Sequence, residues 1–423
     1  MTPMARSWQP DDFDPHDPAF LADPFPTYAL FRQDAPIHYV KLYESYWMFR
    51  YADCAQILNG TDIWVKNLPA GANPGPAGAN PAPAGANPGP AGANPAPGPY
   101  GVMSNFPPSL FFADPPLHTK LRSLLEPMFL KAITSAPQIT RVIAGRLLAD
   151  ARQHGRIELI SDYALPLPAE VLFTLLGIPN DPGVWSGLIE WQAAITAAHD
   201  TTQSQTTRGV GATCSMALNS FFEGMLLANT TAPGTGLFAQ ICQEFAAAGL
   251  SPQEIQACAS DLLVAGYLST TFILGTGVRN LLLNPDQLAA LRGNPSLINA
   301  AVEEMLRVDG PVQVIDRVAA ADTEVGGQPF RTGVTVTAVV GSADHDPSAF
   351  ADPDRFLIQR TGQAHLSFGA GIHRCVGAPL VRLVAPIAIE MLLGAFPGLA
   401  LDGVPQWQTD PYLRAVTSLP LRF

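Results

Sequence analysis

Apolar residues recur at three- and four-residue spacing through most of the chain after position 118, which predicts amphipathic helices. Several of these segments begin on Ser, Asp, Asn or Pro, which are residue types that favour helix starts. The segments are 119–132, 138–153, 167–176, 185–198, 213–228, 252–283, 285–292, 295–308 and 378–396. Between 314 and 340 the pattern changes to short Val-rich stretches interrupted by Gly326, Gly327 and Gly333, which predicts small hairpins. We therefore expect a mainly α-helical protein with small β-sheets.

One segment has neither pattern. Residues 70–97 are tandem copies of a seven-residue unit, AGANPGP or AGANPAP, with no charge and no large apolar side chain. Prolines fix φ and remove amide donors while glycines add freedom, so we expect a solvated loop. We interpret it as an insertion of no chemical consequence, and the alternative is a lid over a pocket.

Composition narrows the class of protein. With 47% hydrophobic and 14% charged residues, the 423-residue chain has ample material for a buried core. Polar residues, Asp261 and Ser269 among them, interrupt the longest apolar run too often for a membrane span, and the first residues show no signal core. The net charge of -12 argues against nucleic-acid binding. We expect a cytoplasmic protein.

The five cysteines are an odd number, lie far apart and form no CxxC pair, so neither a disulfide framework nor a zinc site is indicated. One of them, Cys375, lies in a segment unlike the rest of the chain. Gly369, Gly371 and Gly377 surround it and allow the backbone to turn tightly, so that amides can point at the sulfur. A helix start follows directly, and its positive end favours a thiolate. We therefore interpret residues 368–377 as a loop that holds one anionic sulfur ligand.

Position for position, residues 368–377 match FGxGxHxCxG, and in this the chain resembles the bacterial members of the cytochrome P450 family. The resemblance implies that Cys375 is the axial ligand of the iron of haem b. A thiolate in that position donates electron density that promotes cleavage of the oxygen–oxygen bond. It further implies cofactor contacts from Phe368, Gly369, His373 and Gly377, with Phe368 shielding the sulfur from water.

Other segments agree with this resemblance. Glu304 and Arg307 resemble the family's ExxR pair, in which a carboxylate and a guanidinium share one helix face and form a structural ion pair. Residues 114–122 resemble the DPPxHxxxR segment, which implies that His118 and Arg122, and further along Arg317, hold the haem propionates. Residues 343–350 resemble a third segment, from whose ANRDP form Asp344 and His345 depart. The resemblance extends from about residue 23 to the end, so we expect one domain over 1–423, with 70–97 as its insertion.

The central helix departs from the family pattern where oxygen is activated. Ala265 and Gly266 match the small-residue pair that admits dioxygen, and Ser269 and Thr270 retain the alcohol that relays protons. Leu268, however, occupies the position of the family's acid and cannot supply a proton. Three alternatives follow: water or a substrate group delivers the proton through Ser269, the enzyme uses peroxide or catalyses a rearrangement or dehydration, or the relay is degenerate.

Four residues are expected to contact the substrate by the same resemblance. Asp261 lies four residues before Ala265, a spacing that places both on one helix face, and it could bind a polar substrate or a water chain. The alternative for Asp261 is a capped or solvated carboxylate at the pocket rim, because a buried unpaired carboxylate is costly. The other expected contacts are Val264, Val312 and Gln313.

The resemblance implies an oxidoreductase that inserts an oxygen atom from dioxygen into an apolar or amphipathic small molecule. Electrons would come from a separate ferredoxin or flavodoxin, docked near Lys120, Lys131 and Arg382. We expect a monomer. The alternatives are a peroxide-using or non-oxygenating haem-thiolate enzyme, motivated by Leu268, and a haem sensor or carrier without turnover.

Overall fold

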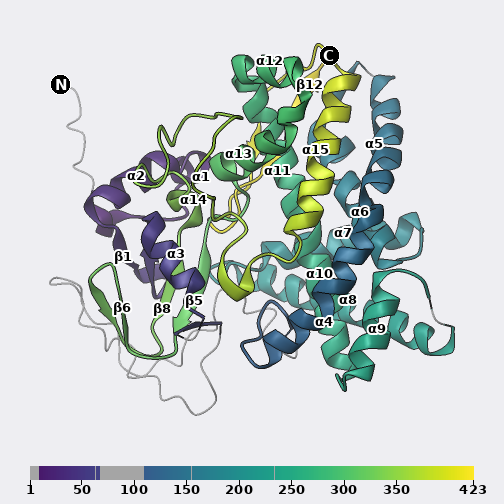
Figure 1. The fold of residues 1–423 in the computed structure, drawn as a ribbon, viewed down its shortest axis with the longest axis horizontal. Helices are drawn as coiled ribbons and strands as arrows, with labels where there is room; N and C mark the ends of the chain where they lie inside the picture. Colours follow the sequence, from purple (N-terminus) through teal and green to yellow (C-terminus); the bar gives the residue numbers. More distant parts are fainter. Residues whose placement is uncertain (1–8, 62, 67–108, 154, 233) are drawn as a thin grey trace.

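The computed structural model describes residues 9–61, 63–66, 109–153, 155–232 and 234–423. A five-stranded sheet with short helices occupies one side of the molecule, and a larger group of long helices occupies the other (Figure 1). The repeat at 70–97 lies outside the described residues. Its interpretation as an insertion, and the single domain, therefore stay predictions.

Helices dominate the described residues, which confirms the expected fold class. Two of them, α1 and α14, are short. The helices are α1 (Pro18–Ala22), α2 (Phe25–Asp34), α3 (Tyr51–Asn59), α4 (Leu117–Ala132), α5 (Ala136–Arg152), α6 (Pro166–Leu176), α7 (Pro182–Ala197), α8 (Gln205–Thr231), α9 (Leu237–Ala247), α10 (Pro252–Gly266), α11 (Leu268–Leu283), α12 (Pro285–Gly293), α13 (Ile298–Asp309), α14 (Val340–Ala343) and α15 (Ala378–Ala395).

The largest sheet has the order β1-β2-β8-β5-β3 and combines N-terminal with late strands. Strands β2 and β8 are parallel, and the other neighbours in it are antiparallel. A three-stranded sheet, β4-β12-β9, and the pairs β6-β7 and β10-β11 complete the strands. Their bounds are β1 (Ile37–Val40), β2 (Ser45–Met48), β3 (Trp64–Val65), β4 (Arg156–Glu158), β5 (Ile315–Ala319), β6 (Thr323–Val325), β7 (Gln328–Phe330), β8 (Thr335–Ala338), β9 (Ala400–Leu401), β10 (Gln406–Trp407), β11 (Val416–Ser418) and β12 (Pro420–Arg422).

The sequence pattern was wrong at one important place. It predicts a single helix over 252–283, but Tyr267 has φ -127° and belongs to neither α10 nor α11. The pattern also left α2, α3 and α9 unpredicted. The hairpins expected between 314 and 340 are present as β5 to β8.

The core of the helical side surrounds α10, α11, α13 and α15. By length and composition, the stretches Pro252–Leu283 and Ala378–Ala395 could cross a membrane. In the folded chain, however, 78% and 61% of their most apolar windows are buried, as is usual for core helices of globular proteins. The burial explains why these two stretches are so apolar.

Arg414 ties the two ends of the chain together. Its guanidinium forms an ion pair with Asp309 at the end of α13 and donates to the carbonyl oxygens of Leu21 and Ala22 in α1, each at 3.2 Å. The sheet side is thereby fastened to the helical side at a buried position.

Candidate active site

The loop that carries Cys375 is held in shape by its own backbone. The amide of Cys375 donates to the carbonyl oxygen of Phe368 at 2.9 Å, which closes the loop. Gly369 and Gly371 have φ of 65° and 68°, a region that favours glycine. A Cβ at Gly371 would lie 2.4 Å from the carbonyl oxygen of Leu58 in α3, so only glycine fits there.

The sulfur of Cys375 faces the start of α15. Surrounding atoms disfavour the charged form and raise the pKa of Cys375, although part of the side chain is accessible, and hydrogen bonds from the amides of Gly377 and Ala378 oppose this shift. Donors of this kind stabilise a thiolate. The amides at the start of α15 are thus placed as the sequence predicts, and a metal bound to the sulfur would further favour the anion.

A buried network of ion pairs and hydrogen bonds holds the segment that precedes the loop. Glu304 and Arg307 form the expected pair on α13, at 2.8 and 2.9 Å, and Arg360 adds two further bonds to the same carboxylate. Asp344 accepts from the amide of Leu366 and the hydroxyl of Ser367, directly before the loop. At this position, where the family form has Asn, Asp344 thus supplies a carboxylate that positions the chain leading into Cys375.

Cationic and imidazole side chains gather beside the loop. The rings of His118 and His373 lie 4.3 Å apart, and each has a buried Nε2 atom with no hydrogen-bond partner among the described residues. Burial, and then nearby Lys66 and Arg317, lower the pKa of His373 to about 2. Arg122 pairs with Glu126 and also donates to the carbonyl oxygen of Arg374. The structure thus brings His118, Arg122, Arg317 and His373 together.

Lys66 belongs to this cluster and was missed by sequence reasoning. It follows β3, whose register places Val65 opposite Val318, so that Lys66 lies beside Arg317 on β5. Its backbone amide donates to Asp114, and its ammonium lies 4.5 Å from the ring centre of Phe111. Burial, and then the neighbouring Arg317, lower the pKa of Lys66 to about 7. The pairing of β3 with β5 is not visible in the sequence, so no local signal could have found this residue.

These residues fit a haem. Two buried imidazole nitrogens without partners among the described residues, with the guanidinium groups of Arg122 and Arg317 close by, match a group with carboxylates at its edge. A single accessible sulfur with helix-start amides behind it suits the iron ligand. The guanidinium of Arg382 lies 4.7 Å from the ring centre of Phe368, the first residue of the loop.

The junction of α10 and α11 holds the residues predicted to act on oxygen. Ser269 donates its hydroxyl to the carbonyl oxygen of Ala265 at 3.5 Å, and Thr270 is buried. A Cβ at Gly266 would lie 2.7 Å from Leu172 of α6, which gives this glycine a packing reason as well. Leu268 is partly buried against the core, so its side chain adds no polar group there.

Asp261 is bonded to the chain itself. Its carboxylate accepts from the amide of Phe111 at 3.2 Å and from the hydroxyl of Ser109. Burial raises the pKa of Asp261 to about 6, and the two hydrogen bonds oppose that rise. The structure therefore favours the second alternative, a capping carboxylate, which holds the segment before α4 against α10.

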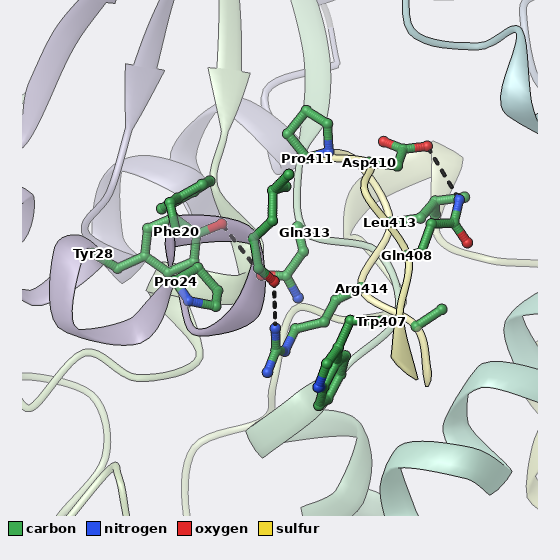
Figure 2. A pocket seen from close by; sticks show the side chains of 12 residues that line it. Phe20, Pro24, Tyr28, Gln313, Trp407, Gln408, Asp410, Pro411, Leu413 and Arg414 are labelled. Carbon is green, nitrogen blue, oxygen red and sulfur yellow. Dashed lines mark hydrogen bonds between the residues drawn. The ribbon is translucent and has the colours of Figure 1, made fainter. Parts of the chain in front are cut away.

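The side chain of Gln313 is hydrogen-bonded within the protein. Its side-chain amide donates to the carbonyl oxygen of Gly310 at 2.8 Å and its oxygen accepts from Tyr28 at 3.3 Å, so both ends are engaged in packing. Figure 2 shows Gln313 with Tyr28 and Arg414 around a cavity of about 20 Å³, which has room for one water. The prediction that Gln313 orients a substrate is therefore not supported by its contacts.

The remaining predicted residues lie as follows. Val312 forms an isolated β-bridge with Leu413, and Val264 is buried on α10. Trp185 and Phe222 pack in the core of the helical side. Arg382 pairs with Glu303. Lys120 and Lys131 are exposed.

Comparison with known proteins identifies the family of this chain. The family model described as cytochrome P450 matches residues 237–420. The chain is 32% identical over 413 residues to the cytochrome P450 monooxygenase PikC of Streptomyces venezuelae, which covers 96% of this chain and 92% of PikC. It is also 32% identical to 6-deoxyerythronolide B hydroxylase of Saccharopolyspora erythraea, over 96% of this chain and 97% of that protein.

Solved structures of this family have the same fold. The chain superimposes on P450BioI, solved in complex with an acyl carrier protein ligated to hexadec-9Z-enoic acid, with a TM-score of 0.83 and 29% identity, over 96% of this chain and 99% of that one. A similar match, with a TM-score of 0.81 and 27% identity, is the enzyme CxnD, described as forming a C–S bond in chuangxinmycin biosynthesis, over 95% of this chain and 94% of that one.

Proposed function

The chain belongs to the cytochrome P450 family, and we propose that it is a monooxygenase that oxidises an apolar or amphipathic small molecule of secondary metabolism with dioxygen. As a member of this family it is an oxidoreductase with haem b as its cofactor. The proposal concerns the oxidant, the substrate class and the source of electrons. The observation that carries it is the hydroxyl of Ser269, retained at the junction of α10 and α11 and directed at Ala265.

Different residues of the chain would hold the haem and deliver protons. Cys375 would ligate the iron, and His118, Arg122, Arg317, His373 and the newly found Lys66 would hold the propionates. The bound haem supplies the chemistry that activates oxygen. Ser269, with Thr270 behind it, would order a water molecule that carries protons, because Leu268 cannot donate one. Ala265 and Gly266 would leave room for dioxygen beside it.

Electrons would come from a separate ferredoxin or flavodoxin that docks near the exposed Lys120 and Lys131, where an acidic protein would be attracted. Arg382 is paired with Glu303 and is a weaker candidate for that contact. We further propose a single-domain, monomeric enzyme of the cytoplasm.

A second function is favoured by one observation. Leu268 lacks the family's acid and packs against the apolar core, so a peroxide-driven or non-oxygenating reaction, which needs no proton relay from that position, also fits the site.

Turnover of a panel of candidate substrates distinguishes the monooxygenase from this second function. One arm uses NADH with surrogate ferredoxin proteins and the other uses hydrogen peroxide alone. Product in the NADH arm, with one oxygen atom from labelled dioxygen, supports the monooxygenase. Product from peroxide only, or product without added oxygen, supports the second function. A chain that binds haem but converts nothing in either arm would contradict both.

A further inference from the structure

The break between α10 and α11 is stabilised by a residue from a third helix. Tyr267, with φ -127° and ψ -32°, separates the last residue of α10 from the first of α11. The last carbonyl groups of any helix lack partners within that helix. At this junction those carbonyl groups belong to residues 263–266, of which Leu263 and Val264 are buried, and a buried polar atom without a partner is costly.

Two side chains take two of these carbonyl groups. The amide nitrogen of Gln192, on α7, donates to the carbonyl oxygen of Val264 at 3.1 Å, and Ser269 donates to that of Ala265 at 3.5 Å. Gln192 also donates to Thr196 at 2.9 Å and accepts from the hydroxyl of Tyr267 at 3.2 Å. Gln192 is 1% exposed and Tyr267 is fully buried.

This set of bonds fixes the orientation of the Gln192 amide. A side-chain amide has two N–H groups and one oxygen, and here all of them are used. Rotation of the amide by half a turn would place its oxygen against the carbonyl oxygen of Val264, which is repulsive. The nitrogen therefore faces Val264.

We propose that Gln192 is a positioning residue that keeps the break between α10 and α11 open and thereby sets where Ser269 lies. The inference rests on the proposed function for its consequence in turnover. In an unbroken helix the amide of Leu268 would bond to the Val264 carbonyl. Gln192 occupies that carbonyl instead, and its oxygen holds the Tyr267 side chain that separates the two helices. Helix α7 packs on α8 and α10. Through Gln192, the position of α7 therefore affects where α11 begins.

Three variants, which remove different sets of hydrogen bonds, test the role of Gln192 at the junction. Gln192→Met removes all bonds of the amide, Gln192→Glu keeps an acceptor for Tyr267 but loses the donor to Val264, and Tyr267→Phe removes only the hydroxyl. Gln138→Met, at an exposed position on α5, is the matched control. Hydrogen exchange of the haem-loaded protein without substrate gives the first measurement, and hydrogen peroxide release with NADH and a surrogate ferredoxin gives the second.

The expected result is at least about fivefold slower exchange of the Leu268 and Ser269 amides in both Gln192 variants, because a continuous helix would protect them. Peptides of α5 and α15 should exchange as in the parent, and Tyr267→Phe should show a smaller effect. Peroxide release should rise several-fold in the Gln192 variants. Unchanged or faster exchange at Leu268, or a general change in all peptides, would overturn the proposal. Slower exchange in a protein that shows no NADH consumption would uphold Gln192 while contradicting the monooxygenase.

Discussion

Arg122 on α4 donates a hydrogen bond of 2.7 Å to the carbonyl oxygen of Arg374, the residue that precedes Cys375. The same guanidinium is paired with Glu126, and burial and then this guanidinium lower the pKa of His118. Arg122 is therefore bonded to the ligand loop as well as close to the imidazole that would bind a propionate.

Replacing both His118 and Arg122 by Ala should accelerate haem loss by more than tenfold. Charge-assisted hydrogen bonds contribute about 1.5 to 3 kcal/mol each, and the Arg122 change also frees the Arg374 carbonyl. Transfer of haem to an apo-globin measures the rate. Equal rates in parent and variant would remove both residues from the cofactor site.

Cys375→Ala should abolish the red-shifted absorption band of the reduced carbon monoxide complex, because only a thiolate ligand produces that shift. Cys242→Ala, on α9, is the control and should keep the band. Persistence of the band in Cys375→Ala would show that the ligand assignment is wrong.

Lys66→Met should accelerate haem release about fivefold, since a partly buried ion pair contributes on the order of 1 kcal/mol. Lys131→Met, at an exposed position, should leave the rate unchanged. Repeating the measurement with haem dimethyl ester, which lacks the carboxylates, should cancel the Lys66 effect. A Lys66 effect of the same size with the ester would mean that this residue acts on packing alone.

Leu268→Asp should maintain or raise the fraction of electrons that end in product, because an acid near the oxygen helps a proton-limited step. Ser269→Ala should increase hydrogen peroxide leakage several-fold while substrate affinity stays within about twofold, a difference of about 0.4 kcal/mol. Coupling is measured from NADH consumed, peroxide formed and product. Unaltered coupling in both Ser269→Ala and Thr270→Ala would sink the relay assignment.

Asp261 should make stability depend on pH. Its pKa is raised from 3.8 to about 6 in the folded chain, so the folded state binds a proton more tightly than the unfolded state. The resulting stabilisation is complete below about pH 4 and is lost as pH rises through about 6. The Tm of Asp261→Asn should therefore improve relative to the parent between pH 4 and 7. A constant Tm difference across that range would contradict the assignment.

Local patterns predicted much of the fold because long helices repeat their apolar spacing within the segment itself. The Cys375 loop was equally visible, since its glycines and its helix start are neighbours in sequence. The break at Tyr267 was not, because it depends on Gln192, 75 residues earlier. The spacing of Asp261 and Ala265 predicted that both lie on one face of the helix. It could not predict that Asp261 accepts a hydrogen bond from the amide of Phe111, because that contact depends on how distant segments pack.

Pairing between distant strands was likewise beyond the sequence. Lys66 joins the cationic cluster only because β3 lies beside β5, and the short β3 has no distinctive pattern. Gln313 was placed in the pocket by resemblance, but Tyr28 of α2 engages its oxygen. Both cases concern polar side chains whose partners come from far along the chain.

The bonds from Arg414 to the carbonyl groups of Leu21 and Ala22 span 393 and 392 positions. A ribosome that adds about 5 to 20 residues per second makes α1 many seconds before it makes Arg414. Strand β12, which pairs with both β4 and β9, is made later still. The contact between α1 and Arg414 therefore cannot form until position 414 has been made, and nascent chains that stall before it should remain sensitive to protease between α1 and α2.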